Sequence, residues 1–457
     1  MLIKVRKNAI FRIPLPSLAR SSFSFCIRLL NEETGPFLTD SISDFRLTDF
    51  RRSFSFSILE AKAYLLKLYL RRLVLKLYRE LASMSAEKKI VDIKDSIKRH
   101  VAMLRPFFPK RAVISIGNYA SDLLHESPVF VDKTGEFILF IRKENQNVPR
   151  KFPGGEEINF VDIDEKADTH YWFNVQRYVS ENDDIVEKLK RKPIEELNGA
   201  VLVASTGEGV GSALLPELIS RFKEGNVNAV AFAVLPSNLQ PADAQFNALW
   251  SMAACSQNGF TQILIDRDAL ESYVGVNRKG EILKGSSVFN YIMEIALSND
   301  SFVQEFCELT KSFHLKMFTV LSATGASLKV YGSIRNVLDA ALLRPLGLFD
   351  LSTASMLYVV VRVPLRLKDK FSSGKIELAV DEWFKEKTSL KAAFLSEPIY
   401  VDDGSDRLDI VMFVGGFDLA NRVAALNGKA KEIIAYSAKN GFVKEKEWKE
   451  LINHLVN

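Results

Sequence analysis

The fold of this chain is decided by a glycine-rich stretch, which reads Ala204-Ser205-Thr206-Gly207-Glu208-Gly209-Val210-Gly211-Ser212. The apolar run 200–203 before it is typical of a buried strand, and the pattern over 214–223 after it is typical of a helix. A second apolar run, 229–235, follows at once. Strand, glycine loop, helix and strand in this order predict a βαβ unit.

The glycines of this loop predict a place for a phosphate group. Gly207, Gly209 and Gly211 alternate along the chain, which lets backbone N–H groups point into one hollow. The helix behind them adds roughly half a positive charge at its N-terminus. The alternative is a glycine-rich turn that only lets a strand meet a helix, and these residues alone leave both interpretations open.

Composition is that of an ordinary globular protein large enough for two or more domains. The 457 residues are 47% apolar and 26% charged. The three cysteines lie far apart and form no CxxC pair, which favours free thiols in a reducing compartment, and the five histidines show no metal-ligand spacing. No apolar run approaches the roughly 20 residues that span a bilayer. We therefore expect a cytoplasmic protein.

Charge divides the chain into two parts. Residues 1–83 carry 15 Lys or Arg against 7 Asp or Glu, whereas the remainder carries 46 against 49. The main body is slightly acidic, so it lacks the basic surface that nucleic acid requires. We expect no nucleic-acid partner.

Residues 1–83 are predicted to be a basic N-terminal extension. The first 30 residues contain no acid, a composition that resembles a transit peptide, and 58–81 reads as a basic amphipathic helix. That helix would contact an anionic membrane or a partner, or simply cover the main domain. A third interpretation is a mis-assigned start, because Met84-Ser85-Ala86-Glu87 resembles a natural beginning.

A second glycine turn stands earlier in the chain. Gly117-Asn118 follows the predicted strand 112–116 and precedes a helix that starts near Ser121. The next predicted strand, 128–133, contains Asp132, and carboxylates at strand ends often hold Mg²⁺ beside phosphate. A plain turn residue is the alternative interpretation of Asp132.

The order of the predicted elements indicates an α/β fold in three parts. Strands and helices alternate through 84–285, which predicts a doubly wound parallel sheet. A long helical pattern covers 286–311 and predicts a central helix. The last part, 312–457, mixes strands such as 356–363 and 408–414 with helices, and predicts a smaller mixed α/β C-terminal domain.

Taken in order, these motifs resemble the tubulin/FtsZ superfamily over about residues 110 to 420. The family signature G-G-G-T-G-[ST]-G stands here as 205–211, and 129–132 is similar to the tubulin strand that ends in a Mg²⁺-associated acid. Residues 265–270 resemble the V-D-N-E-A segment, and Phe289-Asn290 resembles a tubulin pair whose asparagine reads guanine. In the last third, the stretches that resemble the second FtsZ domain are 319–322, 348–352 and 415–417.

The resemblance implies that 84–285 is a nucleotide-binding domain. It also implies a cytoskeletal protein that binds GTP or GDP with Mg²⁺ and joins itself or a related tubulin/FtsZ-like protein head to tail. The residues that it implies around the nucleotide are Gly117, Asn118, Gly207, Glu208, Gly209, Val210, Gly211, Arg267 and Asn290. It implies Asp132 as the metal ligand and Asn290 as the residue that reads the base.

Two departures from the family pattern bear on activity. Glu208 replaces the signature threonine, and two unit charges 4 Å apart repel by ~1 kcal/mol in water and ~4 kcal/mol at an effective dielectric of 20. Unless Mg²⁺ or Lys133 screens the carboxylate, nucleotide binding is expected to weaken by roughly one to three orders of magnitude. Arg267 stands at the asparagine of V-D-N-E-A, where it would contact the base with another geometry.

The family's catalytic loop, N-x-D-x-x-D, follows the central helix and acts on the neighbouring subunit's nucleotide. Aligning 319–322 with the family places Lys311, Phe313 and Lys316 at its asparagine and two acids. None of these can supply the carboxylate that polarises water, so we assign no catalytic residue and expect weak or absent hydrolysis. His314 as a substitute base is the alternative to a plain surface histidine.

Two other functions remain open from the sequence. The fold is also compatible with a nucleotide-free pseudo-GTPase scaffold that binds another filament protein or a membrane. A dinucleotide-binding enzyme is disfavoured, because the loop reads GxGxG and not GxGxxG and does not follow the first strand.

Overall fold

The computed structural model describes residues 2–5, 9–12, 89–103, 111–125, 137–144, 151, 158–182, 184–185, 197, 199–347, 349–387 and 392–456. They belong to two compact units, Met1–Lys88 and Lys89–Asn457. In the first unit, β1 (Leu2–Val5) and β2 (Ala9–Arg12) pair antiparallel. The basic helix predicted over 58–81 lies outside the described residues.

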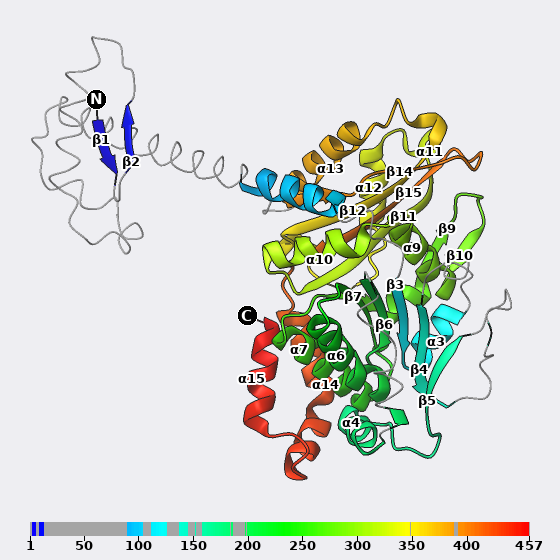
Figure 1. The fold of residues 1–457 in the computed structure, drawn as a ribbon, viewed down its shortest axis with the longest axis vertical. Coiled ribbons are helices and arrows are strands. Elements are labelled where there is room, and N and C mark those ends of the chain that lie inside the picture. Colours follow the sequence, from blue (N-terminus) through cyan, green and yellow to red (C-terminus); the bar gives the residue numbers. More distant parts are fainter. Residues whose placement is uncertain are drawn as a thin grey trace, which may run out of the picture. The chain divides into compact units, whose positions relative to one another are not determined.

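The second unit is built on one long mixed sheet (Figure 1). Seven parallel strands lie side by side, in the order β5 (Asn159–Ile163), β4 (Phe137–Lys143), β3 (Arg111–Ile116), β6 (Gly199–Ser205), β7 (Ala229–Leu235), β8 (Gln262–Asp266) and β11 (Met317–Ser327). The chain moves outward in one direction from β3 and in the other from β6. The predicted doubly wound parallel sheet is confirmed, and its strand order reverses between β3 and β6.

The mixed part predicted for the last third continues the same sheet. Its strands are β15 (Arg407–Gly415), antiparallel to β11, β12 (Met356–Pro364), antiparallel to β15, and β13 (Ala392–Leu395) and β14 (Ile399–Val401), both parallel to β12. Its helices are α11 (Leu328–Tyr331), α12 (Ile334–Leu342) and α13 (Ser373–Lys387).

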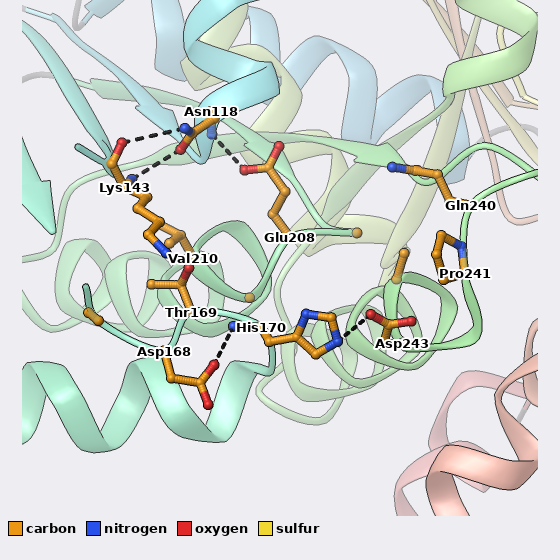
Figure 2. Close-up of a pocket in the computed structure, with 14 residues that line it drawn as sticks. Asn118, Lys143, Asp168, Thr169, His170, Glu208, Val210, Gln240, Pro241 and Asp243 are labelled. Atoms are coloured by element: carbon orange, nitrogen blue, oxygen red, sulfur yellow. Dashed lines mark hydrogen bonds and ion pairs between the residues drawn. The ribbon is translucent and has the colours of Figure 1, made fainter. Parts of the chain in front are cut away.

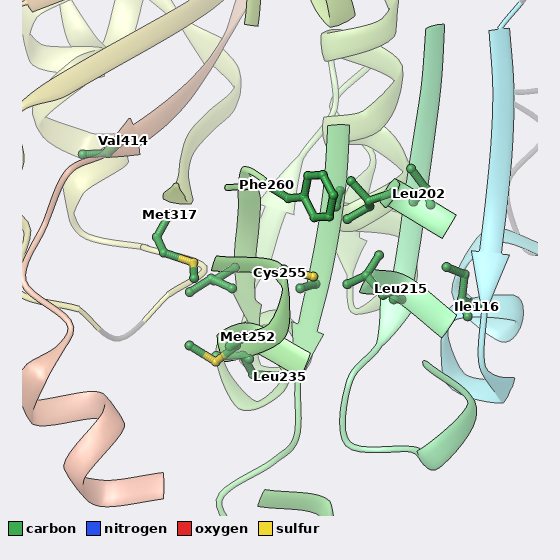
Figure 3. Packing of buried hydrophobic residues seen from close by; sticks show 14 of the residues in the cluster. Ile116, Leu202, Leu215, Leu235, Met252, Cys255, Phe260, Met317 and Val414 are labelled. Atoms are coloured by element: carbon green, nitrogen blue, oxygen red, sulfur yellow. The ribbon is translucent and has the colours of Figure 1, made fainter. Parts of the chain in front are cut away.

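Helices cover both faces of the sheet because its strands are apolar on both sides. Alternate side chains of β6 point to opposite faces of the sheet. One buried cluster contains Ala200, Leu202 and Ala204, and the other contains Val201 and Val203. The first cluster, part of which Figure 3 shows, is covered by α4 (Trp172–Glu181), α6 (Gly209–Glu224), α7 (Ala242–Gln257), α14 (Ala420–Lys439) and α15 (Glu445–Val456). The second is covered by α3 (Asn118–His125), α9 (Ser286–Ser298) and α10 (Phe302–Phe313).

The residues predicted as one central helix, 286–311, form two consecutive helices. α9 ends at Ser298, and α10 begins at Phe302. The side chain of Asn299 accepts a hydrogen bond from the Ser301 N–H at 3.0 Å, a local turn that competes with helix continuation. Before α9, the chain forms α8 (Arg267–Ser272) and a hairpin of β9 (Val274–Val276) and β10 (Ile282–Lys284).

The loop of that hairpin is tied to the last third of the chain by an ion pair. Arg278 donates to both carboxylate oxygens of Asp403 at 2.8 Å, and its own side chain is 5% exposed. Hydrogen bonds from Arg278 lower the pKa of Asp403 to about 2. Burial of the carboxyl raises this pKa, but the effect is smaller. The pair therefore stabilises the fold only while Asp403 is ionised.

Replacing Asp403 with Asn should lower the free energy of unfolding by about 1 kcal/mol near neutral pH, because the carboxylate is partly exposed and screened. Since the folded pKa lies below the unfolded value of 3.8, this difference is present above pH 3.8 and shrinks as pH falls toward 2. Urea unfolding of both proteins across this range measures it. Asp402→Asn, at the exposed neighbour, is the control, and a difference that stays constant down to the lowest pH at which both fold would contradict the prediction.

Candidate nucleotide pocket

Two strand-to-helix turns meet at the point where the strand order reverses. β3 and β6 are parallel neighbours with Ile116 paired to Ala204, so both strands end at the same edge of the sheet. β3 leads through Gly117 into α3, and β6 leads through 206–208 into α6. Crevices outside the carboxyl ends of strands at such a reversal are where open α/β sheets bind ligands.

Close approach explains the glycines at two positions of these turns. Gly117 has φ +97°, and a Cβ there would lie 2.1 Å from Ser205 Oγ. Gly211 lies in the first turn of α6, where a Cβ would lie 2.0 Å from the Ser205 carbonyl oxygen. Gly117 is therefore needed for packing the two turns against each other, and Gly211 for packing the start of α6 against the end of β6, whether or not a phosphate binds.

A pocket of about 500 Å³ opens beside the two turns (Figure 2). It is lined by Asn118, Lys143, Ala167, Asp168, Thr169, His170, Gly207, Glu208, Gly209, Val210, Gln240, Pro241, Asp243 and Ala244. These residues come from the carboxyl ends of neighbouring parallel strands and from the starts of α3, α6 and α7. The glycine loop thus forms part of the wall of a cavity large enough for a small-molecule ligand.

Glu208 is the residue that most changes the character of this pocket. Its Oε2 accepts a hydrogen bond from the Asn118 N–H at 2.6 Å, and its Oε1 accepts one from the Tyr119 N–H at 2.9 Å. Burial raises the pKa of the Glu208 carboxyl, and these two N–H donors act against that rise. The carboxylate therefore lies on the first N–H groups of α3, which are anion-binding groups.

With Glu208 included, the described residues that line the pocket comprise three acids against one lysine and one histidine. His170 Nε2 lies 2.5 Å from Asp243 Oδ2, and Asp168 accepts from the His170 N–H at 3.0 Å and from Asn174 at 2.7 Å. The lysine among the residues that line the pocket is Lys143. A polyanionic ligand would therefore need a cation to accompany it.

Asn247 of α7 joins three segments of the pocket wall. Its Nδ2 donates to the carbonyl oxygens of His170 at 2.9 Å and Gly207 at 3.3 Å, and its Oδ1 accepts from the Trp172 N–H at 3.1 Å. The side chain is 1% exposed. Asn247 thus positions the 168–172 segment against the glycine loop without reaching a ligand itself.

The structure brings most of the predicted phosphate-contacting residues together. Asn118, Gly207, Glu208, Gly209 and Val210 line the pocket, and Gly117 and Gly211 shape the two turns behind it. The Asn118 side chain pairs with the backbone of Lys143, so it holds α3 to β4. Asp132, the predicted metal ligand, lies outside the described residues.

The two predicted base-contacting residues lie elsewhere. Arg267 stacks on the ring of Tyr119 at 4.0 Å and bonds Glu271 at 2.7 Å. Asn290 is 5% exposed, and its Nδ2 donates to the Leu123 carbonyl oxygen at 2.8 Å, whereas its Oδ1 has no partner. Neither residue belongs to the pocket lining, and their contact with a base stays a prediction.

Sequence reasoning missed the far wall of the pocket. Lys143 is the last residue of β4, and Asp168, Thr169 and His170 follow β5. The signal present in the sequence is positional, because these residues lie at or after the carboxyl ends of parallel strands, which meet at one edge of the sheet.

The helix break also changes where the catalytic-loop motif falls. With α9 ending at Ser298, the six residues that follow it read Asn299-Asp300-Ser301-Phe302-Val303-Gln304. The asparagine of N-x-D-x-x-D is then present, while buried Ser301 and Gln304 stand at the two acid positions. Asp300 is exposed but stands one position too early. The register at 311–316 depended on the alignment of 319–322, which lie in strand β11, and both registers lack the two acids.

The sequence matches no protein-family model and no curated protein. Solved structures match its fold. CetZ1 from Haloferax volcanii, a GDP-bound monomer, superposes with a TM-score of 0.55 at 17% identity over 71% of this chain and 99% of CetZ1. CetZ2 from the same organism, a GTPγS-bound protofilament, gives 0.55 at 17% identity over 72% and 99%. The empty FtsZ dimer from M. jannaschii gives 0.52 at 12% identity over 71% and 92%.

These neighbours are tubulin/FtsZ superfamily proteins, and the chain has the tubulin/FtsZ fold. The resemblance inferred from the collinear motifs is confirmed at that level. Among the described residues, no helix is both long and apolar enough to cross a membrane, and no group of three or more acidic, histidine or cysteine side chains is arranged to hold a metal ion.

The packing of the glycine turn predicts a large effect of one added methyl group. Gly211→Ala should destabilise the fold by about 3 kcal/mol, because its Cβ would meet the rigid Ser205 backbone. Gly428→Ala is the matched control: Gly428 is exposed in α14 with open space around it, so alanine should stabilise by about 0.5–1 kcal/mol. Equal thermal unfolding midpoints for the two variants would contradict this account of the turn.

Proposed function

We propose that this chain is a tubulin/FtsZ-like cytoskeletal protein that binds GTP or GDP in the pocket beside β3 and β6. In this proposal it assembles head to tail with itself or a related protein. The observation that carries the proposal is the glycine loop of the family signature lining a 500 Å³ pocket at the reversal of the sheet. The GDP-bound CetZ1 monomer and the GTPγS-bound CetZ2 protofilament, which share the fold, support it.

The start of α6 fits a phosphate group. The first N–H groups of a helix have no partner within it, and Gly209 and Val210 at this start line the pocket. A bound nucleotide would direct its phosphates there, with Lys143 in the same wall. Mg²⁺ would offset the pocket's carboxylates, and Asp132 remains our proposed ligand for it.

Base recognition by Asn290 and Arg267 belongs to the same proposal. Guanine presents N–H donors that need an acceptor, and Asn290 Oδ1 is a buried acceptor without a partner. Arg267, held over Tyr119 next to the α3 turn, would stack on or bond to the base.

Hydrolysis is proposed to be weak or absent. Residues 311–316 offer no acid at the motif positions, and residues 299–304 place Ser301 and Gln304 there. Charge stabilisation and water activation at a γ-phosphate need groups that these side chains do not supply.

Phosphate release from GTP should therefore stay near the uncatalysed background under conditions that favour assembly, and Asp300→Asn should leave it unchanged. Asp300 is tested because it is the exposed acid next to the motif positions. A clear GTPase rate in the natural chain that Asp300→Asn lowers tenfold or more would contradict this, and would show that Asp300 supplies the missing carboxylate.

A second candidate function is a nucleotide-free scaffold that binds another filament protein or a membrane. It is favoured by Glu208, which already occupies the N–H groups of α3, and an empty FtsZ dimer shares the fold. Membrane contact through 58–81 belongs to this candidate as well as to the first.

Nucleotide content after gentle purification separates the two candidates. Our leading proposal expects bound GDP or GTP in the extract, or binding of added GTP in a calorimeter, and filaments by electron microscopy that depend on added GTP. No bound nucleotide, no calorimetric signal and assembly that ignores GTP would favour the scaffold instead.

A further inference from the structure

Glu208 stands at the N-cap of α6 but does not cap that helix. Its side chain makes no bond to an N–H of α6. It reaches across to α3, ninety positions earlier in the chain, and gives one oxygen to each of two adjacent N–H groups. The usual capping residues bond their own helix, so this geometry is an interaction between the two turns of the pocket.

The geometry is that of an anion on a helix N-terminus. Two consecutive backbone N–H groups directed at two oxygens of one acidic group are the contacts a bound phosphate makes at such a place. Gly117 leaves the room: a Cβ at this position would lie 2.9 Å from Glu208 Oε2. Meanwhile the start of α6 faces the same pocket without a side-chain cap.

We propose that the Glu208 carboxylate is a built-in competitor for a ligand phosphate, holding the α3 half of the pocket's anion site and so determining how tightly phosphorylated ligands bind. The inference rests on the proposed nucleotide site and adds the residue that regulates its affinity. A phosphate at α3 must displace the carboxylate, and a phosphate held at α6 alone must lie next to it.

The size of the effect follows from charge. At a separation of 4 Å, repulsion between unit charges weakens binding by about five-fold at the dielectric of water and by about a thousand-fold at an effective dielectric of 20. The lost N–H contacts add to this. Removing the carboxylate should therefore tighten binding by at least about ten-fold.

The test compares the full chain with two variants at this position. Glu208→Thr is short enough to vacate both α3 N–H groups, whereas Glu208→Gln keeps the length, removes the charge and retains one acceptor oxygen. Calorimetric titration with GTP and with GDP, both with Mg²⁺, should give affinities in the order wild type, Gln variant, Thr variant. The Thr variant should bind both nucleotides at least ten-fold more tightly than the wild type does.

Glu217→Gln is the matched control. Glu217 lies on α6, its side chain is 49% exposed, and it bonds Arg221 on the same helix, so it should bind nucleotide as the wild type does. Thermal unfolding without ligand shows which variants fold. If the Thr variant does not fold, the Gln variant carries the test, with an expected gain of at least three-fold.

Two outcomes overturn the inference in distinguishable ways. If the wild type binds nucleotide as tightly as the folded Glu208 variants, the competitor role is wrong and the nucleotide site stands. If the wild type and all folded variants fail to bind GTP or GDP at about millimolar concentration, the proposed nucleotide site itself is wrong, and the competitor role is lost with it.

Discussion

The parallel pairing of β3 with β6 is the constraint on which the pocket depends. These strands are distant in the chain, and their pairing places two strand-to-helix turns at one edge with Ile116 beside Ala204. Gly117 is needed where Ser205 of the other turn approaches, and Gly211 is needed where α6 lies against Ser205 at the end of its own strand. The glycine pattern is thus explained first by packing, and the anion-binding geometry of two helix starts follows from it.

Glu208 shows how one substitution at such a place alters the chemistry without altering the fold. A carboxylate beside two helix N-termini gains from N–H donors and from the helix dipoles, which offsets part of its desolvation. The same position in the family signature holds a threonine, whose short side chain cannot reach a second helix. The carboxylate satisfies two N–H donors of α3, which are the groups that a ligand phosphate would contact in our proposal.

The sequence allowed the fold to be predicted where local patterns are strong, and the site only in part. The run 200–203, the glycine loop and the run 229–235 correspond to β6, the turn into α6 and β7, because two-sided burial makes parallel strands uniformly apolar. The break at Asn299 was not predicted, since apolar spacing continues across it while a side-chain turn stops the helix. The hydrogen bonds between Glu208 and α3 join residues about ninety positions apart, so no local pattern predicts them. From the sequence, the only expected effect of Glu208 was repulsion between its carboxylate and a phosphate.

The C-terminal helices pack against elements that form the pocket wall. α14 and α15 pack against α7 (Figure 1), although the sequence placed them in the second domain. The first residues of α7 line the pocket. Arg422 of α14 bonds Asp266 at 2.6 Å, and that carboxylate is fully buried at the end of β8. Lys429 bonds Asn238 at 2.9 Å, in the loop that continues to Gln240 and Pro241 of the pocket rim. Removing the partner of a buried charge is strongly destabilising, so Arg422 fixes α14 to the end of β8. The same guanidinium donates to Asn238 Oδ1 at 3.3 Å, so α14 is tied at once to the buried strand end and to the loop that forms the pocket rim.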